Sequence, residues 1–455
     1  MDEINWGDLE RLVSKGMISR RVLLRHLIQA GGVAAVIGPG STLLAACGET
    51  QKAAGPSGPV PSGFPSINNS ILGKKMTLTI LLAADYYNAP PFAELYANFQ
   101  KAYPDITLQV TNAVWEDIPA KVKTAALGGT PIDVAHQHAF VYGHIGVAEQ
   151  VDDLWSKWGK AGDFLPNSLQ DVTWAGHRYG IPLDVNCLFT IYNKDLFASV
   201  NATPPTATTS YPDLGKELLK FQGKPVKAIG LSNSAWNNSG LARANGGDLL
   251  KSDEKGVQLN NDKVVAALKW NSELGWKYGV GTSPAPTKRQ DEPTFLFIAK
   301  QVALLFTGPW DMPDITKSGV SFGTTELPKG LDGNTTGSVQ GGGSLFVGKG
   351  SKNREAAFEF MKWAAAPPHQ IRMAKEMARW PVIADLYSNP ATIGANDPAL
   401  APYFKQLKTA KPYKLEAFPE GDKAWSDAVA SAYNGKDPQT VLGAAQSKAA
   451  AAIGG

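Results

Sequence analysis

The sequence has only two cysteines, Cys47 and Cys187, among 455 residues. Two thiols cannot build a disulfide framework or a four-thiolate zinc site. An excess of one charge sign is also missing, because 44 Lys and Arg face 41 Asp and Glu and leave a formal charge of +3. This balance gives no reason to expect nucleic acid or another polyanion as the partner. The charged fraction of 19% is low for a globular protein.

Long hydrophobic runs are missing as well. The apolar stretch over residues 30–46 is interrupted by glycines and a proline, so it is too short and too weakly hydrophobic for a permanent membrane span. We therefore expect residues 1–46 to be a cleaved signal peptide. Arg20 and Arg21 resemble a twin-arginine signal, although Val22 stands where Phe is commoner.

The apolar stretch ends in Leu44-Ala45-Ala46-Cys47, which resembles a bacterial lipobox. Acyl chains on Cys47 would hold an exported protein at the outer face of the plasma membrane. The alternative is a leader cut by ordinary signal peptidase, in which Cys47 has no role. Residues 47–75 are rich in Gly and Pro and poor in apolar residues, so they are predicted to form a flexible tether.

From Met76 onward the pattern is that of an α/β protein. Alternating apolar residues predict strands over 76–82 and 106–110, and residues 132–135 predict a short buried strand. Apolar residues at three- and four-residue spacing predict helices between these strands, over about 90–103 and 117–127. Such an order requires a parallel sheet, and ligands bind beyond the carboxyl ends of its strands. The loops at 85–88 and 136–140 are expected there.

Several ordered blocks carry a family resemblance. They include Tyr192-Asn193-Lys194-Asp195, Gly308-Pro309-Trp310 and Gly341-Gly342-Gly343-Ser344, together with residues 99–106, 121–134, 180–182 and 356–363. This series resembles the extracellular solute-binding proteins of ABC importers, and in pattern the carbohydrate binders of the maltose-binding type. The resemblance implies the type II periplasmic-binding-protein fold. In this α/β fold two lobes, each a mixed and mostly parallel sheet flanked by helices, enclose a central ligand cleft beside a hinge.

The resemblance also implies how the chain is divided between the lobes. The first lobe is expected to contain residues 75–188 and 327–352, and the second lobe residues 191–325 and 353–455. The chain is expected to cross between the lobes near 189–193 and near 320–327. These crossings would form the hinge.

A sugar presents an apolar face of C–H groups and a rim of hydroxyls, so its site needs aromatic platforms beside amides, carboxylates or guanidinium groups. Trp310 matches the tryptophan that stacks on the ligand in the family. Trp236 lies in a polar segment nine residues before Asn245, where the family has another stacking aromatic. A tryptophan that follows a strand is often a core residue, and this alternative remains for Trp310.

Polar partners for the hydroxyls are expected from the strand ends and the matching blocks, although each could instead cap a helix or turn. His136 and His138 could also be read as metal ligands or as plain loop polarity. Arg379 would be the one obvious cation in the cleft, unless it only covers a helix end, and it leaves the charge of the ligand open. The full predicted set is Asp85, Tyr86, Asn88, His136, Gln137, His138, Asp184, Asn186, Trp236, Trp310, Gly342, Ser344 and Arg379.

We expect no catalytic residue, cofactor or bound metal. The segment from Gly343 to Lys349 has the spacing of a phosphate-binding loop, but Gly350 stands where Ser or Thr would hold magnesium. Cys187 lacks the sequence context of a nucleophile. The predicted function is a monomeric, membrane-tethered receptor that passes a sugar or oligosaccharide to an ABC permease with a cytoplasmic ATPase. A secreted carbohydrate-active enzyme and a metal-capturing lipoprotein remain as alternatives.

Overall fold

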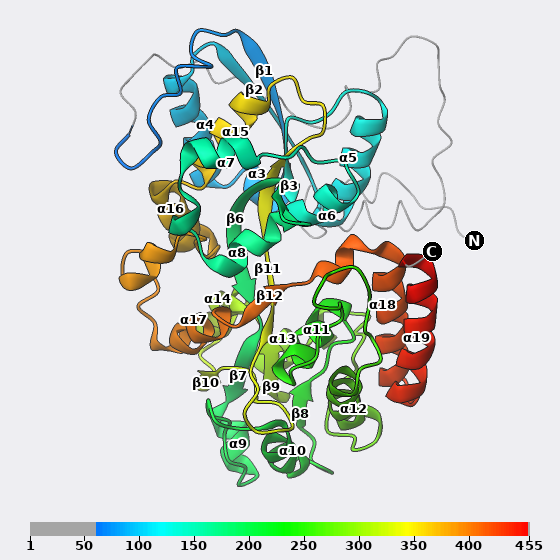
Figure 1. Cartoon of the computed structure of the whole chain (residues 1–455). Helices are drawn as coiled ribbons and strands as arrows, with labels where there is room; N and C mark the ends of the chain where they lie inside the picture. Colours follow the sequence, from blue (N-terminus) through cyan, green and yellow to red (C-terminus); the bar gives the residue numbers. More distant parts are fainter. Residues whose placement is uncertain (1–60, 454–455) are drawn as a thin grey trace, which may run out of the picture. The chain divides into compact units, whose positions relative to one another are not determined.

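The computed structural model describes residues 61–453 (Figure 1). The expected signal peptide, with Arg20, Arg21 and Cys47, lies outside the described residues, as does the first part of the expected tether. Among the helices of residues 61–453, none combines the length and the apolar character that a bilayer crossing requires.

The predicted β-α-β-α-β unit is confirmed. Strand β1 (Met76–Ala83) pairs in parallel with both β2 (Ile106–Ala113) and β3 (Val134–Gln137). Helix α4 (Pro90–Ala102) connects β1 to β2, and α5 (Ile118–Leu127) connects β2 to β3. Helix α4 packs on β2, and its apolar stripe belongs to the same buried core cluster as the apolar residues of β1.

Three strands from later in the chain complete this first sheet. Strand β11 (Ser338–Val347) pairs antiparallel with β3 and with β6 (Gly180–Cys187), and parallel with β12 (Ala410–Pro412). The resulting order is β12-β11-β3-β1-β2, with β6 beside β11. The register between β11 and β6 shifts between Gly343 and Ser344, as at a β-bulge.

A second sheet has the order β10-β7-β9-β8. It contains β7 (Phe189–Asn193), β8 (Lys227–Gly230), β9 (Val302–Thr307) and β10 (Phe322–Thr325). A single residue, Leu188, separates β6 of the first sheet from β7 of the second, and the chain returns to the first sheet between β10 and β11.

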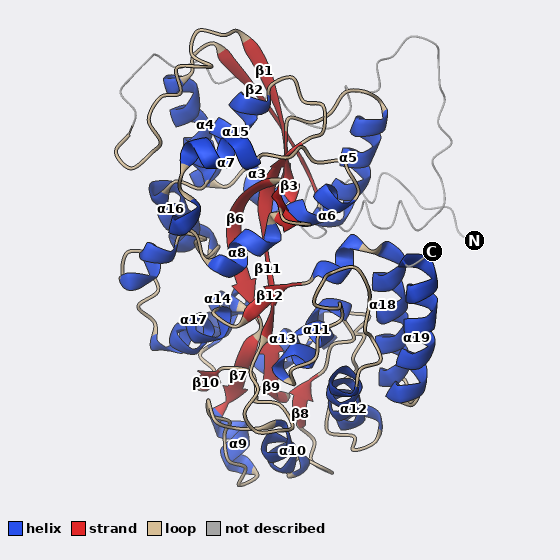
Figure 2. Ribbon diagram, in the orientation of Figure 1, coloured by secondary structure: helices blue, strands red, loops and turns tan. Residues whose placement is uncertain are grey.

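Helices flank the strands of both sheets (Figure 2). The remaining helices and strands of the described chain are α3 (Ala84–Tyr87), α6 (Ala139–His144), α7 (Asp152–Trp158), α8 (Pro166–Asp171), β4 (Thr173–Trp174), β5 (His177–Arg178), α9 (Lys194–Ser199), α10 (Tyr211–Leu219), α11 (Ala235–Ala244), α12 (Asp262–Trp276), α13 (Pro293–Ile298), α14 (Met312–Ser318), α15 (Arg354–Ala364), α16 (Pro367–Met377), α17 (Ala401–Leu407), α18 (Pro419–Tyr433) and α19 (Pro438–Ile453).

The helices that follow β11 are divided differently from the expectation that residues 353–455 all join the second lobe. Helix α15 packs on β6, β11 and α4, and α16 packs on α4. Trp363 of α15 lies against Phe99 of α4, with ring centroids 5.6 Å apart. Helix α17 packs on strands of both sheets, and the last helices, α18 and α19, pack on α12, with α18 also on α11. The apolar stripe of a helix shows that it is buried, but it does not show which sheet it covers.

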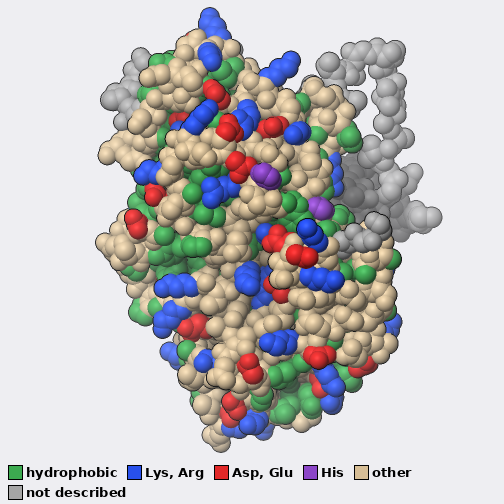
Figure 3. All heavy atoms as spheres, viewed as in Figure 1, with side chains coloured by type: hydrophobic (Ala, Val, Ile, Leu, Met, Phe, Trp, Pro, Cys, Tyr) green, Lys and Arg blue, Asp and Glu red, His purple; other side chains and the backbone are tan. Residues whose placement is uncertain are grey.

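The surface agrees with the near balance of charges in the sequence. On the face shown in Figure 3, Lys and Arg side chains are interspersed with Asp and Glu side chains. This face therefore presents no extended field of one sign.

Candidate functional site

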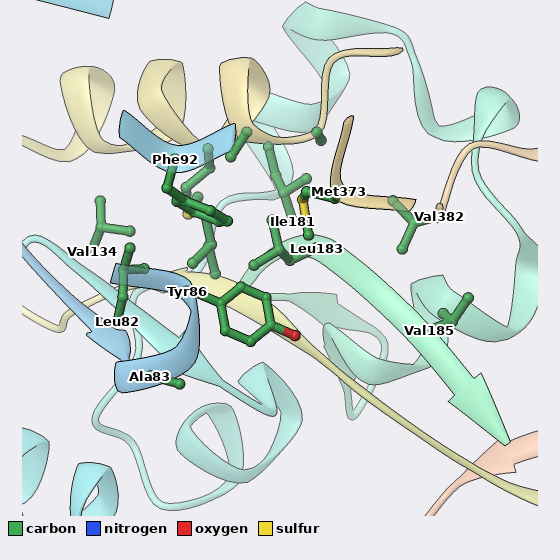
Figure 4. Close-up of a cluster of buried hydrophobic side chains, with 14 of the residues drawn as sticks. Leu82, Ala83, Tyr86, Phe92, Val134, Ile181, Leu183, Val185, Met373 and Val382 are labelled. Carbon is green, nitrogen blue, oxygen red and sulfur yellow. The ribbon is translucent and has the colours of Figure 1, made fainter. Parts of the chain in front are cut away.

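Helix α3, which directly follows β1, carries Asp85 and Tyr86. Tyr86 is only 4% exposed, and its hydroxyl donates a hydrogen bond of 3.0 Å to Oδ1 of Asp184 on β6. The Tyr86 ring packs edge-on against Phe92, and Figure 4 shows its hydroxyl pointing away from Phe92. The apolar cluster therefore holds the ring and leaves the polar end free to bond Asp184.

Arg379, just beyond α16, joins these residues. Its guanidinium donates to Oδ2 of Asp85 at 2.5 Å and lies 5.1 Å from the centroid of the Tyr86 ring. Asp85, Tyr86, Asp184 and Arg379 thus form one group, which we call the polar cluster. Three separate chain segments supply it, so it exists only in the folded protein.

Electrostatics within the polar cluster follow from burial. Burial raises the pKa of Asp184 to about 6, although Arg379 and the Tyr86 hydroxyl favour its charged form. Burial also raises the pKa of Tyr86 well above its usual range. Burial disfavours the charge on Arg379, but Tyr86, Asp184 and Asp85 outweigh this effect and raise its pKa. Arg379 therefore stays charged near pH 7 and is paired with Asp85.

Three successive glycines of β11 leave room for side chains from neighbouring elements. A Cβ atom at Gly343 would lie 2.5 Å from Nε2 of His136, and one at Gly341 would lie 2.5 Å from Oδ1 of Asn186 and 2.9 Å from Cζ2 of Trp236. Gly342 has φ of +104°, a conformation that residues with a side chain rarely adopt. The glycine-rich block thus lets aromatic and polar side chains approach the backbone of β11 closely.

Two tryptophans lie close together, and one of them, Trp236, lies against Gly341 of β11. Trp236 lies at the start of α11, and Trp310 lies in the short 3-10 helix η4 (Pro309–Asp311) directly after β9. Their ring centroids are 5.9 Å apart and the rings are inclined by 56°. Trp310 is 42% exposed, so it is not a core residue. We call Trp236 and Trp310 the tryptophan pair.

Strand β6 connects the polar cluster with the tryptophan pair. Asp184 and Asn186 are two residues apart, so their side chains share a face of β6 at a spacing of about 7 Å. Asp184 belongs to the polar cluster, whereas Asn186 lies opposite Gly341 and beside Trp236. The candidate site therefore combines polar groups of the first sheet with aromatic rings carried by α11 and by η4, which directly follows β9 of the second sheet.

His136, Gln137 and Ser344 from the predicted set are buried beneath this site. His136 is fully buried between the rings of Tyr86 and Trp115, and burial lowers its pKa to about 3, so it is neutral. Gln137 donates to the carbonyl of Trp115, and Ser344 donates to the carbonyl of Gln137. These three side chains are buried in this conformation, so they hold the neighbouring site residues in place and are not exposed to a ligand. Asn88, by contrast, is exposed at the end of α3.

His138 is paired with carboxylates. Its Nδ1 lies 2.7 Å from Oδ1 of Asp171 on α8, and its Nε2 lies 3.9 Å from Oε2 of Glu416. Burial alone would lower the pKa of His138, but the two carboxylates outweigh it and raise the pKa to about 9. Within residues 61–453 no group of three His, Cys, Asp or Glu side chains is arranged to hold a metal ion.

Trp115 was missed in the sequence analysis. It opens the short 3-10 helix η1 (Trp115–Asp117) after β2, and its ring centroid lies 5.2 Å from that of His136. A Cβ atom at Gly343 would lie 3.2 Å from Cη2 of Trp115. A usable signal was present, because Trp115 follows the carboxyl end of a strand parallel to β1, where ligand-binding loops gather.

The comparisons with known proteins agree with this architecture. A family model described as bacterial extracellular solute-binding protein matches residues 94–402. The maltotriose-binding protein of Pyrococcus abyssi is 23% identical over 348 residues, covering 73% of this chain and 72% of that protein.

Two solved structures show the same fold. One is an ABC substrate-binding protein from Listeria monocytogenes in complex with cycloalternan, with a TM-score of 0.71, 20% identity and coverage of 84% of this chain and 100% of that one. The other is UgpB from Mycobacterium tuberculosis in complex with glycerophosphocholine, with a TM-score of 0.71, 19% identity and coverage of 83% and 98%. The chain therefore has the two-lobe, type II periplasmic-binding-protein fold.

Proposed function

The chain belongs to the family of bacterial extracellular solute-binding proteins, and we propose that it captures a neutral sugar or oligosaccharide for an ABC importer. The observation that carries this proposal is the tryptophan pair, whose Trp236 lies against Gly341 of β11, together with the polar cluster, whose Asp184 lies on the neighbouring strand β6. Aromatic faces bind the C–H surface of a sugar ring, and the carboxylates of the polar cluster accept hydrogen bonds from its hydroxyls.

The charge of the site favours a neutral ligand. Arg379 is already paired with Asp85, and the carboxylate of Asp184 is close by. A phosphate or carboxylate on the ligand would have to displace Asp85 from Arg379 and would meet Asp184 as a like charge. Hydroxyl groups can add hydrogen bonds to the same side chains without breaking this pair.

We propose a division of the chain into two lobes that is based on which helices pack on which sheet. We assign the first sheet with α15 and α16 to the first lobe, and the second sheet with α18 and α19 to the second lobe. Leu188, between β6 and β7, is a proposed hinge residue. A ligand that touches the polar cluster and the tryptophan pair gains contacts with both lobes, and it therefore favours the closed state.

Export and anchoring belong to the proposal as well. We propose that residues 1–46 are removed, that Cys47 is lipidated, and that the loaded receptor then docks on the permease. Replacement of Cys47 by Ala should release the protein from membranes or leave the precursor uncut. A fully processed Cys47→Ala protein that stays with the membrane fraction would contradict the lipid anchor.

A thermal-shift screen tests the ligand class. Monosaccharides, maltooligosaccharides, polyols, sugar phosphates and glycerophosphodiesters are compared, because a ligand that binds only the folded state raises the melting temperature. We expect a shift with at least one neutral saccharide, and no shift with that saccharide in the Trp236→Ala/Trp310→Ala double variant. A shift with a phosphorylated compound alone would contradict the neutral sugar. Chromatography of the recovered saccharide separates binding from hydrolysis, since a receptor returns it unchanged.

A further inference from the structure

An apolar groove of about 360 Å³ lies beside the candidate site. One wall comes from η4 and α14, next to the second sheet, and the other wall comes from the segment that follows α16. A volume of this size is enough for a small organic group. The lining residues are Pro309, Met312, Pro313, Thr316, Lys317, Ala378, Trp380, Asp397 and Leu400.

Residues that line the groove are direct sequence neighbours of residues in the proposed sugar site. Ala378 and Trp380 line the groove, and Arg379 between them belongs to the polar cluster. On the opposite wall, Pro309 lines the groove, and the next residue is Trp310 of the tryptophan pair. Each wall of the groove therefore contains a residue that is directly bonded in the chain to a residue of the proposed sugar site.

The chemistry of the groove differs from that of the sugar site. Proline, methionine, leucine and tryptophan side chains form most of its walls, and Trp380 is only 5% exposed. Lys317 and Asp397 are its two charged residues, they have opposite signs, and both are exposed. Sugar hydroxyls would find few hydrogen-bond partners there, whereas an apolar group would exchange water for apolar contacts.

We propose that this groove holds an apolar aglycone, an alkyl or aryl group, of a glycoside whose sugar ring occupies the candidate site. This inference rests on the proposed function and narrows its ligand class from free sugars to glycosides with an uncharged apolar substituent. The groove then acts as a specificity subsite, because it adds affinity only for ligands that carry the substituent.

Titration calorimetry with matched glycosides tests the inference. Methyl and hexyl α-D-glucosides, and methyl and hexyl maltosides, differ only in the length of the alkyl group. Each methylene that is buried raises affinity by roughly fourfold. We expect the hexyl member of a binding pair to bind at least about tenfold more tightly than the methyl member. Equal affinities for both members would overturn the inference.

A second experiment introduces a charged side chain into the groove. Pro313 lies in the first turn of α14 and is exposed on the groove wall, and an aspartate is well tolerated in a first helical turn. Pro313→Asp should remove the preference for the hexyl glycoside and leave the affinity for the methyl glycoside unchanged. The matched control is Pro367→Asp, which makes the same change at the exposed first residue of α16, outside the groove; this variant should keep the preference.

The outcomes separate the two proposals. If methyl and hexyl glycosides lose affinity equally in Pro313→Asp, the substitution acts on the sugar site and the aglycone subsite is wrong. If saccharides bind but the alkyl length has no effect, the receptor function stands and only the inference fails. If no saccharide or glycoside in either panel binds, the proposed function fails, and the inference fails with it.

Discussion

Trp310 is held in its exposed position by its immediate neighbours. A Cβ atom at Gly308 would lie 2.0 Å from Cζ3 of Trp310, so the ring folds back over a residue that has to be glycine. The following residue, Asp311, accepts hydrogen bonds from the hydroxyls of Thr307 and Thr294. Burial raises the pKa of Asp311, while these two bonds favour its charged form. An exposed aromatic side chain is thus fixed before any ligand arrives, which lowers the entropy cost of binding.

The first prediction concerns this aromatic surface. Trp236→Ala and Trp310→Ala should each weaken ligand binding by about 1 to 3 kcal/mol, the range expected for a buried aromatic contact. Titration calorimetry with the saccharide found in the screen measures the change. Trp276→Ala is the control, because Trp276 is 46% exposed at the end of α12 and lies outside the site. Unchanged affinity together with a collapse of the melting temperature would mean that these tryptophans only stabilise the fold.

The predicted set contains both exposed and buried side chains, and the sequence could not distinguish them for a physical reason. Trp236 stood out because a tryptophan in a polar segment has no reason to be in the core. Gln137 and Ser344 are also polar, but their neighbours in space come from strands that lie about 200 residues apart in the chain. A local pattern shows neither that pairing nor the burial that results from it.

At the scale of elements, β11 depends on its glycines. Gly343 lies against His136, whose ring is fully buried, so neither partner can move aside easily. Small-to-large changes in such packed places force shifts of backbone and side chains. The glycine block is therefore a structural requirement of the strand as well as a feature of the site.

The second prediction follows from this packing. Gly343→Ala should lower the free energy of unfolding by about 1 to 3 kcal/mol, because its Cβ would overlap Nε2 of His136. Urea unfolding measures the change. Gly162→Ala is the matched control, since a Cβ at Gly162 has no neighbour within 4 Å. If both variants unfold at the same urea concentration, the packing around Gly343 is looser than the structure indicates.

His138 links two further elements. It contacts Asp171 of α8 and Glu416 of the 3-10 helix η7 (Lys414–Ala417), which leads from β12 towards α18. The pKa of His138 is about 9, against an ordinary value of 6.5. The folded protein therefore keeps a proton that the unfolded chain releases above pH 6.5. The resulting stability is present in full below pH 6.5 and is lost as the pH rises through 9.

The third prediction is the pH dependence that this pair produces. Between pH 6.5 and 9 the free energy of unfolding of the wild type should fall by up to about 3 kcal/mol more than that of His138→Gln. Urea unfolding across this pH range measures the difference. His177→Gln is the control, because His177 is half-exposed beside Asp152 and such pairs contribute little. Parallel curves for the wild type and His138→Gln would contradict the raised pKa.

The sequence predicted the helices near the N-terminal strands, but it did not predict which sheet each later helix packs on. The first three strands and their two helices were predicted correctly, because each is next to its partner in the chain. Helix α15 has an equally clear apolar stripe, but it follows a strand that belongs to the first sheet, and it packs on that sheet. The family pattern had instead assigned it to the second lobe. Such long-range packing depends on the order of strands in space.

At the scale of the whole molecule, the candidate site is built from both sheets. The polar cluster belongs to the first sheet and its surroundings. Trp310 is carried by η4, directly after β9 of the second sheet, and Trp236 by α11, which follows β8 of the second sheet and packs on β11 as well as on α12 and α18. The connections between the sheets include the single residue Leu188 and the segment from β10 to β11. Short connections of this kind permit a change of angle between lobes while the interior of each lobe stays packed.

The fourth prediction is that the ligand closes the lobes. Because a neutral saccharide would gain contacts from both sheets only in the closed form, saturation should reduce the radius of gyration measured by small-angle scattering. The Trp236→Ala/Trp310→Ala variant provides the control, since it keeps the polar cluster of one lobe and loses the aromatic contacts of the other. At a saccharide concentration that saturates the wild type, this variant should keep the larger radius. A wild type that binds the saccharide without any change in radius would refute closure and would leave the binding site itself intact.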